Sequence, residues 1–223
     1  MRAFFYVLSP TINVSLDHMK EKVVIAGGSG FVGSALIDHL LTNTDYDIVA
    51  LSRSHKHTDN PRVTWRECDL FSLLDIEEAI HDCTRAVYLV HSMLPSARLV
   101  QGDFADFDLT LADNFSRACE AFNLKSIVYL SGIIPEHKEV ASSHLKSRRE
   151  VEEVFENSKV PVTIVLRAGI VMGPQGSSFT ILYNLINRLP VMFCPRWTLS
   201  KTAPVSIWDM VKAIEYGLSL NES

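Results

Sequence analysis

Apolar residues fall into two patterns that alternate along the chain. Six short runs are apolar almost throughout and rich in β-branched side chains, and they lie at residues 23–25, 47–52, 63–67, 86–90, 126–131 and 162–167. Runs of this kind are typical of parallel strands that are covered on both faces. Between them, apolar residues recur at every third or fourth position, which predicts helices. The alternation predicts an α/β fold, a doubly wound parallel sheet whose ligand lies at the carboxyl ends of the strands.

The longest helical stripe lies between the fourth and fifth predicted strands. Its apolar residues are three or four positions apart: Val100, Phe104, Phe107, Leu111, Phe115, Ala118 and Phe122. Such a stripe is expected to face the core. The alternative is that part of it forms a subunit interface, so a monomer and a homodimer both remain open. Two other helices are expected to begin near Ser72, as an N-cap, and at Asp209, the latter continuing over residues 210–218.

The first predicted strand runs into a glycine-rich turn and then into an amphipathic helix. Gly28, Gly30 and Gly33 have the spacing of a dinucleotide-binding turn. We expect Gly28 to permit the tight turn, Gly30 to leave room for phosphates, and Gly33 to let the helix pack closely on the strand. A helix that begins near Phe31 offers a pyrophosphate its unpaired N–H groups and its positive dipole end. The candidate cofactor-binding residues of this turn are Gly27, Gly28, Ser29, Gly30, Phe31, Val32 and Gly33.

The end of the second predicted strand bears on which dinucleotide binds. A site specific for NAD places an acidic side chain there, which bonds the ribose hydroxyls and repels a 2′-phosphate. This chain instead has Ser52, Arg53 and Ser54. The arginine is a planar, permanently charged fork that matches a phosphate, and the serines are further donors. NADP is therefore favoured and NAD stays open. The alternative for Arg53 is an ordinary solvated loop charge.

Charge and cysteine content limit the partners and the compartment. The net charge is -5 and no run of basic residues occurs, which argues against nucleic acid or an anionic membrane surface as the main partner. No segment approaches transmembrane length. No metal site is expected, because no cluster of further ligands joins His55 and His57. We expect reduced, mostly buried thiols and a cytoplasmic location, because no paired spacing occurs among the cysteines, Cys68, Cys83, Cys119 and Cys194.

Three segments are expected along the 223 residues. Residues 19–175 hold the dinucleotide-binding domain, and residues 176–223 form a small helical appendage of the same domain on the substrate side. That appendage is apolar and aromatic, so ordinary packing and a pocket for a hydrophobic or quinone-like molecule both remain open. Residues 1–18 are an N-terminal extension. It carries an apolar run at 3–8 but lacks an export cleavage signal, so we favour an extension that is loose or packs on the surface over a targeting segment.

Several motifs together resemble the short-chain dehydrogenase/reductase superfamily. They are the glycine turn, the pair Asp69 and Leu70 after the third strand, residues 129–132 after the fifth, and residues 166–174 after the sixth. More narrowly, they are similar to its atypical NAD(P)-binding branch, which includes the NmrA-like regulators and the 39 kDa subunit of respiratory complex I. Residues 88–93 and 143–148 resemble bacterial members described as NAD(P)H-binding or NAD-dependent epimerase-like. The resemblance covers residues 22–218 and implies a Rossmann-like fold with a nicotinamide cofactor.

The resemblance also implies where the two ends of the cofactor lie. Asp69 and Leu70 would border the adenine, although Asp69 as a helix cap is a competing interpretation that fits Ser72 better. His91 follows the fourth predicted strand and is expected to be partly buried. A role as a second proton donor stays open for it. A mobile lid is expected to begin with the residues after it. The remaining candidates for the nicotinamide end are His91, Ser92, Met93, Ala168, Gly169, Ile170 and Val171.

Dehydrogenases of this superfamily generally use a tyrosine and, four residues later on the same helix, a lysine. His144 and Arg148 stand in those places here. Ser131, thirteen residues before His144, and Asn114, on the preceding long helix, match the remaining polar positions of the family. Histidine donates and accepts protons near neutral pH, whereas arginine binds a ribose or a carboxylate but does not donate a proton. The candidate catalytic residues are therefore Ser131, His144, Arg148 and Asn114.

Three interpretations of the histidine and arginine stay open. They replace the usual pair in an oxidoreductase that reduces or isomerises a small carbonyl or quinone-like compound. Alternatively they hold NADP(H) without turnover in a redox sensor, regulator or assembly factor, or they belong to a solvated helix face. The last interpretation is the expectation for Arg149, Glu150, Glu152 and Glu153, whose spacing spreads them over the outside of the helix.

Overall fold

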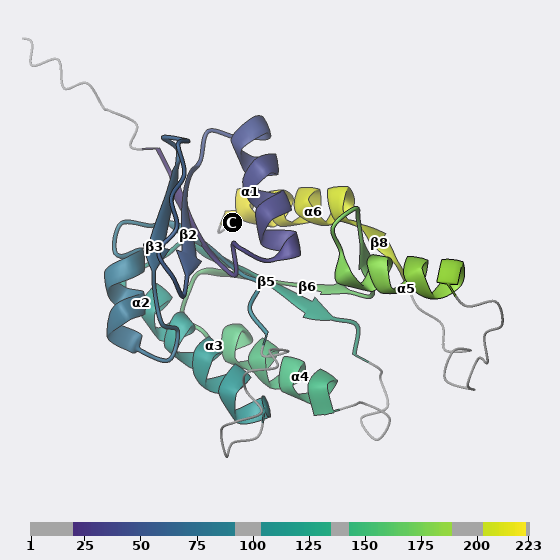
Figure 1. Ribbon diagram of the computed structural model, residues 1–223. Coiled ribbons are helices and arrows are strands. Elements are labelled where there is room, and N and C mark those ends of the chain that lie inside the picture. Colours follow the sequence, from purple (N-terminus) through teal and green to yellow (C-terminus); the bar gives the residue numbers. More distant parts are fainter. Residues whose placement is uncertain (1–19, 92–103, 135–142, 189–202, 222–223) are drawn as a thin grey trace, which may run out of the picture.

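The computed structural model of the chain describes residues 20–91, 104–134, 143–188 and 203–221. Its centre is a parallel sheet of six strands in the order β3-β2-β1-β4-β5-β6 (Figure 1). The strands are β1 (Lys22–Ala26), β2 (Asp47–Ser52), β3 (Val63–Glu67), β4 (Arg85–Tyr88), β5 (Ser126–Gly132) and β6 (Val162–Ala168). The expected doubly wound parallel sheet is confirmed. The strand order reverses between β1 and β4, and in open α/β sheets ligands bind at such a point, beyond the carboxyl ends of the strands.

Helices cover both faces of the sheet (Figure 1). On one face lie α1 (Phe31–Asn43) and α6 (Ile207–Ser219). On the other lie α2 (Leu73–Ile80), α3 (Phe104–Ala121) and α4 (Ser143–Glu156). Each layer encloses its own buried apolar cluster against the sheet. Both strand faces are therefore buried, which explains the nearly continuous apolar runs in the sequence.

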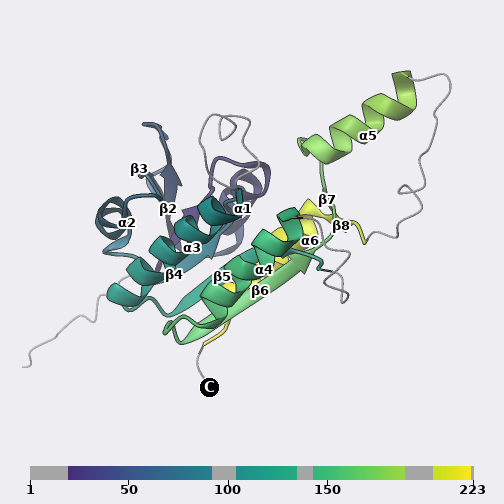
Figure 2. The ribbon, with the colours of Figure 1, turned by 90° about the horizontal axis from the view of Figure 1, so that it is seen from below.

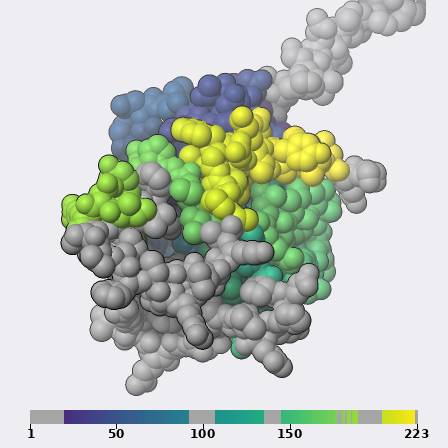
Figure 3. All heavy atoms as spheres, turned by 90° about the vertical axis from the view of Figure 1, so that its right-hand side faces the viewer, coloured from purple at the N-terminus to yellow at the C-terminus, as the bar shows by residue number. Residues whose placement is uncertain are grey.

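The segment after β6 leaves the sheet and returns to it. A second, two-stranded parallel sheet joins β7 (Val171–Met172) to β8 (Val205–Ser206). Helix α5 (Ser177–Arg188) projects away from the main sheet, whereas α6 packs beside α1 (Figure 2). A space-filling view shows α5 and α6 at the surface on this side (Figure 3). The part expected as one appendage thus divides into a projecting helix and a helix of the covering layer. The boundaries at 18 and 175 stay predictions.

Most predicted elements match in position, and β4 is the main exception. It was expected over residues 86–90, but it ends at Tyr88. Its neighbour β1 ends at Ala26, which pairs with Tyr88, and the amide of Leu89 makes one further bond to the Ala26 carbonyl. At Gly27 the chain turns away, so β1 does not continue alongside the residues after Leu89. The turn therefore ends both strands together.

Helix starts follow their caps. Ser72 caps α2 as expected, because its hydroxyl accepts a hydrogen bond from the Asp75 amide. The last helix begins at Ile207 and not at Asp209, since Ser206 is its N-cap and accepts from the Asp209 amide. Asp209 instead lies in the first turn, where a carboxylate is favourable near the positive end of the dipole.

The stripe on α3 faces the core only in part. Leu111, Phe115 and Ala118 are buried, as expected for a core-facing helix. Phe122 is 37% exposed, just beyond the end of the helix. The Phe107 ring packs edge-on against Phe71, which is itself exposed, and residue 100 lies outside the described part. The expectation of a buried stripe is therefore confirmed in the middle of the helix.

The described cysteines are free and buried, as expected: Cys68, Cys83 and Cys119. Burial raises the pKa of the Cys68 and Cys83 thiols to about 12, so they stay protonated at neutral pH. Among the helices that the structure describes, none is both long enough and apolar enough to cross a membrane.

Candidate functional site

The glycine turn after β1 depends on a different glycine than expected. Gly27 has φ +88°, a conformation that residues with a side chain disfavour. The turn closes through a 3.0 Å hydrogen bond from the Gly30 N–H to the Gly27 carbonyl oxygen. Gly28 does not adopt a positive φ, so its expected role in the turn is wrong. A Cβ at Gly28 would lie 3.1 Å from the Ala50 side chain and 3.4 Å from that of Ile37. Gly28 is therefore needed for packing against β2 and α1.

Gly33 and Gly30 face opposite environments. A Cβ on Gly33 would stand 2.3 Å from the Gly27 carbonyl oxygen and 2.7 Å from the Gly28 Cα, so the helix packs on the turn with no room for a side chain. A Cβ on Gly30 would meet, among the described residues, only the Gly27 carbonyl oxygen at 3.3 Å. Gly33 thus serves close packing, as expected. Beyond that single contact, the described residues leave the outer side of the turn at Gly30 uncovered.

Helix α1 starts directly behind this turn without a side-chain cap. Gly30 is its N-cap residue, and among the described residues no side chain accepts a capping bond from the first N–H groups and no carboxylate lies in the first turn. The Ser34 hydroxyl bonds the carbonyl oxygens of Gly30 and Phe31, so it leaves these N–H groups free. The first N–H groups of the helix and its dipole therefore remain available to an anion. The Phe31 ring packs towards Gly173 and Gly176, where an added Cβ would stand 2.9 and 3.1 Å from its atoms. This contact ties the start of α1 to the segment after β7.

The end of β2 carries no carboxylate. Ser52 is buried and its hydroxyl accepts a weak 3.4 Å bond from the Ser54 amide. The side chains of Arg53 and Ser54 are exposed. The end of β2 therefore presents a buried hydroxyl, from Ser52, and an exposed guanidinium, from Arg53.

The loop after β3 is held from two sides. Asp69 does not cap α2, because its carboxylate accepts from the Phe71 amide at 3.0 Å and so closes the loop itself. The Asn114 side chain, on α3, donates to the carbonyl oxygens of Leu70 (3.2 Å) and Phe71 (3.0 Å). Leu70 is half-buried and packs on the core beneath. The structure therefore places Asn114 against the loop expected to border the adenine.

Beyond β4 the expected environment of His91 is wrong. It was expected to be partly buried at a strand end, but it is exposed, three residues after the end of β4. The reason is the early end of β4, which carries His91 out of the sheet. Ser92 and Met93, the other candidates of this segment, lie outside the described residues.

Ser131 and Arg148 lie close together at the carboxyl end of β5. Arg148 donates to the Leu130 carbonyl at 3.4 Å, and a Cβ on Gly132 would lie 3.3 Å from the Arg148 Cδ. Ser131 is 2% exposed, and its hydroxyl forms no hydrogen bond of ordinary geometry with the described residues. His144 lies one turn before Arg148 in the first turn of α4, and its side chain is outside the described part.

Glu152 was expected on the solvated face of α4, and this is wrong. It is fully buried. Its Oε1 accepts from Nε of Arg167 at 3.0 Å and its Oε2 from Nη2 of the same side chain at 2.7 Å. Arg149 adds a 3.0 Å bond from outside, while it also bonds Glu153. Only the outer residues of this charged run are solvated.

The missed residue had a signal in the sequence. Glu152 is four positions after Arg148 and eight after His144, so all three positions share one face of α4. Burial opposes ionisation of Glu152, but the bonds from Arg167 and Arg149 outweigh it and hold its pKa below the usual value. The Ser131 hydroxyl is close enough to contribute to this lowering.

Tyr129 lies beneath the same cluster and remains protonated. Burial raises its pKa to about 12, although Arg148 and Ser131 act in the opposite direction. Its ring packs against Tyr88 and Phe155 with centroids 5.9 and 5.3 Å away. Tyr129 is therefore a neutral part of the floor of this site.

The segment after β6 was expected to approach the nicotinamide end. Ala168 is buried at the end of the strand, and its carbonyl accepts from the Ile133 amide. A Cβ on Gly169 would lie 2.4 Å from the Ala203 carbonyl oxygen, so this glycine is required by the approach of the β8 segment. Ile170 is 40% exposed, and Val171 pairs with Val205 in the small sheet.

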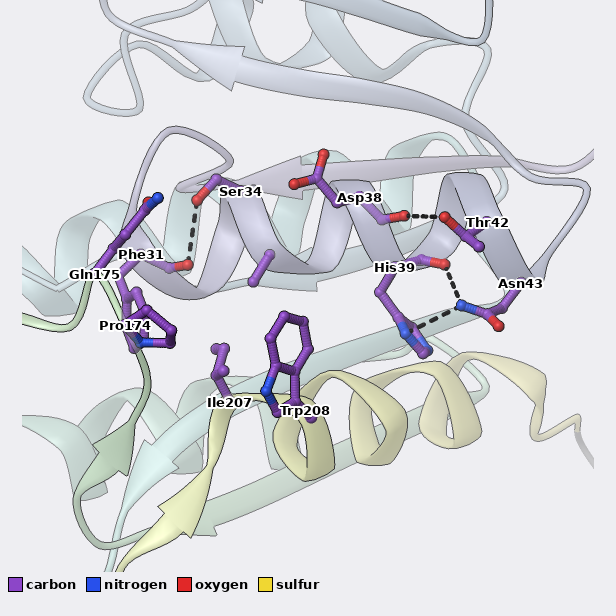
Figure 4. A pocket seen from close by; sticks show the side chains of 11 residues that line it. Phe31, Ser34, Asp38, His39, Thr42, Asn43, Pro174, Gln175, Ile207 and Trp208 are labelled. Carbon is purple, nitrogen blue, oxygen red and sulfur yellow. Dashed lines mark hydrogen bonds between the residues drawn. The ribbon is translucent and has the colours of Figure 1, made fainter.

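A groove of about 400 Å³ lies between α1 and the start of α6 (Figure 4). At one end the Phe31 ring, Pro174 and Trp208 form apolar walls, and Trp208 is 61% exposed. At the other end His39 contacts Glu215 at 2.6 Å and receives a bond from Asn43. This groove lies on the outer side of α1, and the glycine turn lies at its apolar end.

A comparison with known protein families identifies the family of this chain. The family model described as NAD(P)H-binding matches residues 27–185, which include the turn, the end of β2 and the cluster on α4. The chain belongs to this NAD(P)H-binding family. The family's cofactor is a nicotinamide dinucleotide, and the resemblance to the atypical short-chain dehydrogenase/reductase superfamily is confirmed.

Solved structures share the fold at low sequence identity. A UDP-N-acetylglucosamine 4-epimerase from Bacillus cereus is 17% identical with a TM-score of 0.71, over 91% of this chain and 73% of that one. The enzyme WbmG of Bordetella bronchiseptica, solved in complex with NAD, is 18% identical with a TM-score of 0.72, over 92% of this chain and 71% of that one. These likenesses show the Rossmann-like fold of this NAD(P)H-binding protein.

One curated relative is nearer in sequence. The auxiliary protein GraX of Staphylococcus aureus is 33% identical over 116 residues. This stretch is 51% of the present chain and 37% of GraX, so the chain matches little more than a third of that relative's length.

Proposed function

We propose that this family member binds NADP(H) at the carboxyl edge of the sheet, with the pyrophosphate on the N-terminus of α1. The observation that carries the proposal is the glycine turn itself. Gly33 brings α1 against the turn, and the helix start has no cap, so its N–H groups face the space beside Gly30. No charged side chain is needed to hold the diphosphate there.

Selectivity for NADP rests on the end of β2. Arg53 is exposed and follows directly after the buried Ser52, the position from which an acidic residue of an NAD site would bind the ribose. An arginine there attracts a 2′-phosphate and the neighbouring hydroxyls can donate to it. Asn114 supports the adenine end by holding the Leu70 and Phe71 carbonyls.

When bound, NADP(H) would supply hydride chemistry for the reduction of a small carbonyl or quinone-like compound, and the residues at the end of β5 and on α4 would position the reactants. The position of His144 in the first turn of α4 suits a proton donor to the substrate oxygen. Arg148, one turn later and against the end of β5, would bond the nicotinamide ribose or a substrate carboxylate. Ser131 would complete the polar end of β5.

The second candidate is an NADP(H)-dependent regulator or assembly factor without turnover. Two contacts favour it. The Asn114 amide is engaged with backbone carbonyls, and the Ser131 hydroxyl is buried, so neither group faces a substrate as it stands. The relative GraX is itself described as an auxiliary protein. In either case the free, buried cysteines suit a reducing compartment such as the cytoplasm.

Titration with NADPH and NADH tests the proposal, followed by nicotinamide fluorescence and by thermal stabilisation. We expect NADPH to bind about tenfold more tightly than NADH, because one charge-assisted contact to the 2′-phosphate contributes about 1.4 kcal/mol. Arg53→Ala should remove this preference, and Lys56→Ala, a nearby exposed cation, should not. Failure of both nucleotides to bind would refute the proposal.

Turnover then separates the two candidates. Under the catalytic candidate, a screen of carbonyl and quinone acceptors finds NADPH oxidation, and His144→Ala lowers it at least a hundredfold with NADPH binding retained. Under the regulatory candidate, no acceptor is reduced and His144→Ala leaves binding unchanged. Turnover that survives in His144→Ala would exclude the histidine as the proton donor.

A further inference from the structure

The buried carboxylate of Glu152 joins three elements at the carboxyl edge of the sheet. It comes from α4, its partner Arg167 comes from β6, and Arg167 is in register with Ser131 on β5. The two bonds to Arg167, at 3.0 and 2.7 Å, use both carboxylate oxygens and adjacent nitrogens of the guanidinium. A paired geometry of this kind fixes direction as well as distance.

Arg167 is the main partner of the Glu152 carboxylate, because it donates two of the bonds that the carboxylate accepts. Arg149 contacts it as well, but Arg149 is shared with Glu153 and Glu156 on the outer side of the helix. Among the described residues, Arg167 has Glu152 as its one ion-pair partner. The Glu152 carboxylate is fully buried, whereas the Arg167 side chain is 47% exposed and keeps part of its hydration. An ion pair that takes a carboxylate out of water is a weak source of stability compared with apolar packing, because the lost hydration offsets the attraction. Its location, one turn from Arg148, therefore indicates a role in geometry.

Arg148 depends on how α4 sits on the sheet. Its stem packs against Gly132, and its guanidinium reaches the Leu130 carbonyl. A long, flexible side chain is held in one place only when the helix that carries it is fixed relative to the strand it contacts. Glu152 supplies such an anchor on the same face of the helix, one turn further on.

We propose that Glu152 is a positioning residue of the cofactor site. Its carboxylate clamps α4 to Arg167 of β6 and so holds the Arg148 guanidinium at the end of β5, where it meets the nicotinamide half of NADP(H). This inference rests on the proposed function, since it assigns Glu152 a part in binding that cofactor.

The test compares two ligands on the full chain. NADPH spans both halves of the site, whereas 2′,5′-ADP carries the adenine, the 2′-phosphate and one further phosphate but no nicotinamide. We expect Glu152→Gln to raise the Kd of NADPH about tenfold, the effect of losing one charge-assisted contact, and to leave the Kd of 2′,5′-ADP within about twofold. The fluorescence of the bound nicotinamide at saturation should fall as well. Glu153→Gln, one residue on and half-exposed, is the matched control and should change neither ligand.

A double variant separates positioning from direct contact. In an Arg148→Met background, Glu152→Gln should weaken NADPH binding by less than about twofold, because the group that it positions is gone. Circular dichroism establishes that each variant is folded. If Glu152→Gln does not fold, Arg167→Lys tests the same clamp, since lysine keeps the charge but not the paired bonds.

Four results would overturn the inference. Unchanged NADPH affinity and unchanged nicotinamide fluorescence in a folded Glu152→Gln would remove the role. An equal loss for NADPH and 2′,5′-ADP would show a general structural effect, as would full additivity with Arg148→Met. If the unaltered protein binds neither ligand, the proposed function itself fails and the inference falls with it. That outcome is distinguishable, because it appears before any variant is compared.

Discussion

The two ends of the candidate site are built in opposite ways. At the glycine turn, the geometry depends on the absence of side chains, because Gly33 and Gly27 let backbone lie against backbone. At the carboxyl ends of β5 and β6, it depends on charged side chains that meet from separate elements, Glu152 with Arg167 and Arg148 beside Ser131. The first end offers an anion main-chain N–H groups and a dipole, and the second offers side-chain chemistry.

This difference predicts how each end tolerates change. A backbone site has no rotamers to lose and no charge to neutralise, so only added volume disrupts it. A side-chain cluster keeps its shape only while every charge has its partner, because an unpaired buried charge is costly. We therefore expect a glycine turn of this kind to tolerate less variation than a side-chain cluster, where single substitutions change the chemistry.

Gly33→Ala should give the largest effect. The new methyl group would stand 2.3 Å from the Gly27 carbonyl oxygen, so α1 must move away from the turn. We expect a loss of about 2 to 3 kcal/mol in the free energy of unfolding, and NADPH binding below detection. Urea denaturation and fluorescence titration measure the two. Gly30→Ala is the control: its Cβ would stand 3.3 Å from the Gly27 carbonyl oxygen, a far milder contact than the 2.3 Å at Gly33, so stability should change by less than about 1 kcal/mol while phosphate binding is still blocked. A stable Gly33→Ala that binds NADPH would refute the backbone account.

Glu152→Ala should give the second-largest effect, a loss of stability. Removal of the carboxylate takes charge-assisted bonds from Arg167 and Arg149, and because both arginines are partly exposed to water we expect a cost of about 1.5 to 2 kcal/mol in the free energy of unfolding. Glu153→Ala, with a half-exposed carboxylate, should cost less than about 0.5 kcal/mol. Equal losses of unfolding free energy for the two substitutions, measured by urea denaturation, would contradict a larger contribution from the buried Glu152 carboxylate.

Asn114→Ala should act through the adenine loop. Two hydrogen bonds to the Leu70 and Phe71 carbonyls are lost, which should cost about 1 to 2 kcal/mol of stability and weaken 2′,5′-ADP binding a few-fold. If any turnover is found, its rate at saturating NADPH should be nearly unchanged. A hundredfold loss of rate with unchanged affinity would instead indicate that Asn114 takes part in the reaction. Single-turnover kinetics with calorimetric titration distinguish these outcomes.

Lowering the pH should give the smallest effect. The pKa of Glu152 in the folded protein lies below its ordinary value of 4.5, so its contribution is complete above about pH 4.5 and is lost as the pH falls through the lowered pKa. The stability difference between the protein and Glu152→Gln should therefore shrink below pH 4.5. The difference for Gly30→Ala should stay constant, because the turn has no titrating group. Denaturation at pH 7, 5 and 3 measures both. A constant Glu152 difference would contradict the depressed pKa.

What the sequence determined by itself is the part that local geometry controls. The nearly continuous apolar runs and the helical stripes are sufficient for the α/β sheet, and the glycine spacing marks the turn before α1. Helix caps were also readable when the residue types were clear, as at Ser72. These features involve residues within a few positions of one another, so a short stretch of chain contains all the information.

Only the tertiary structure decided the other end. A run of charged residues on α4 predicts a solvated helix, and that is correct for Glu153 but not for Glu152. The difference arises from Arg167, fifteen residues further along the chain and on a strand whose register places it opposite Ser131. The end of β4 was likewise set by the turn at Gly27 on its neighbour. In both cases the outcome depends on a distant element that packs against the residue, and the local sequence pattern contains no information about that element.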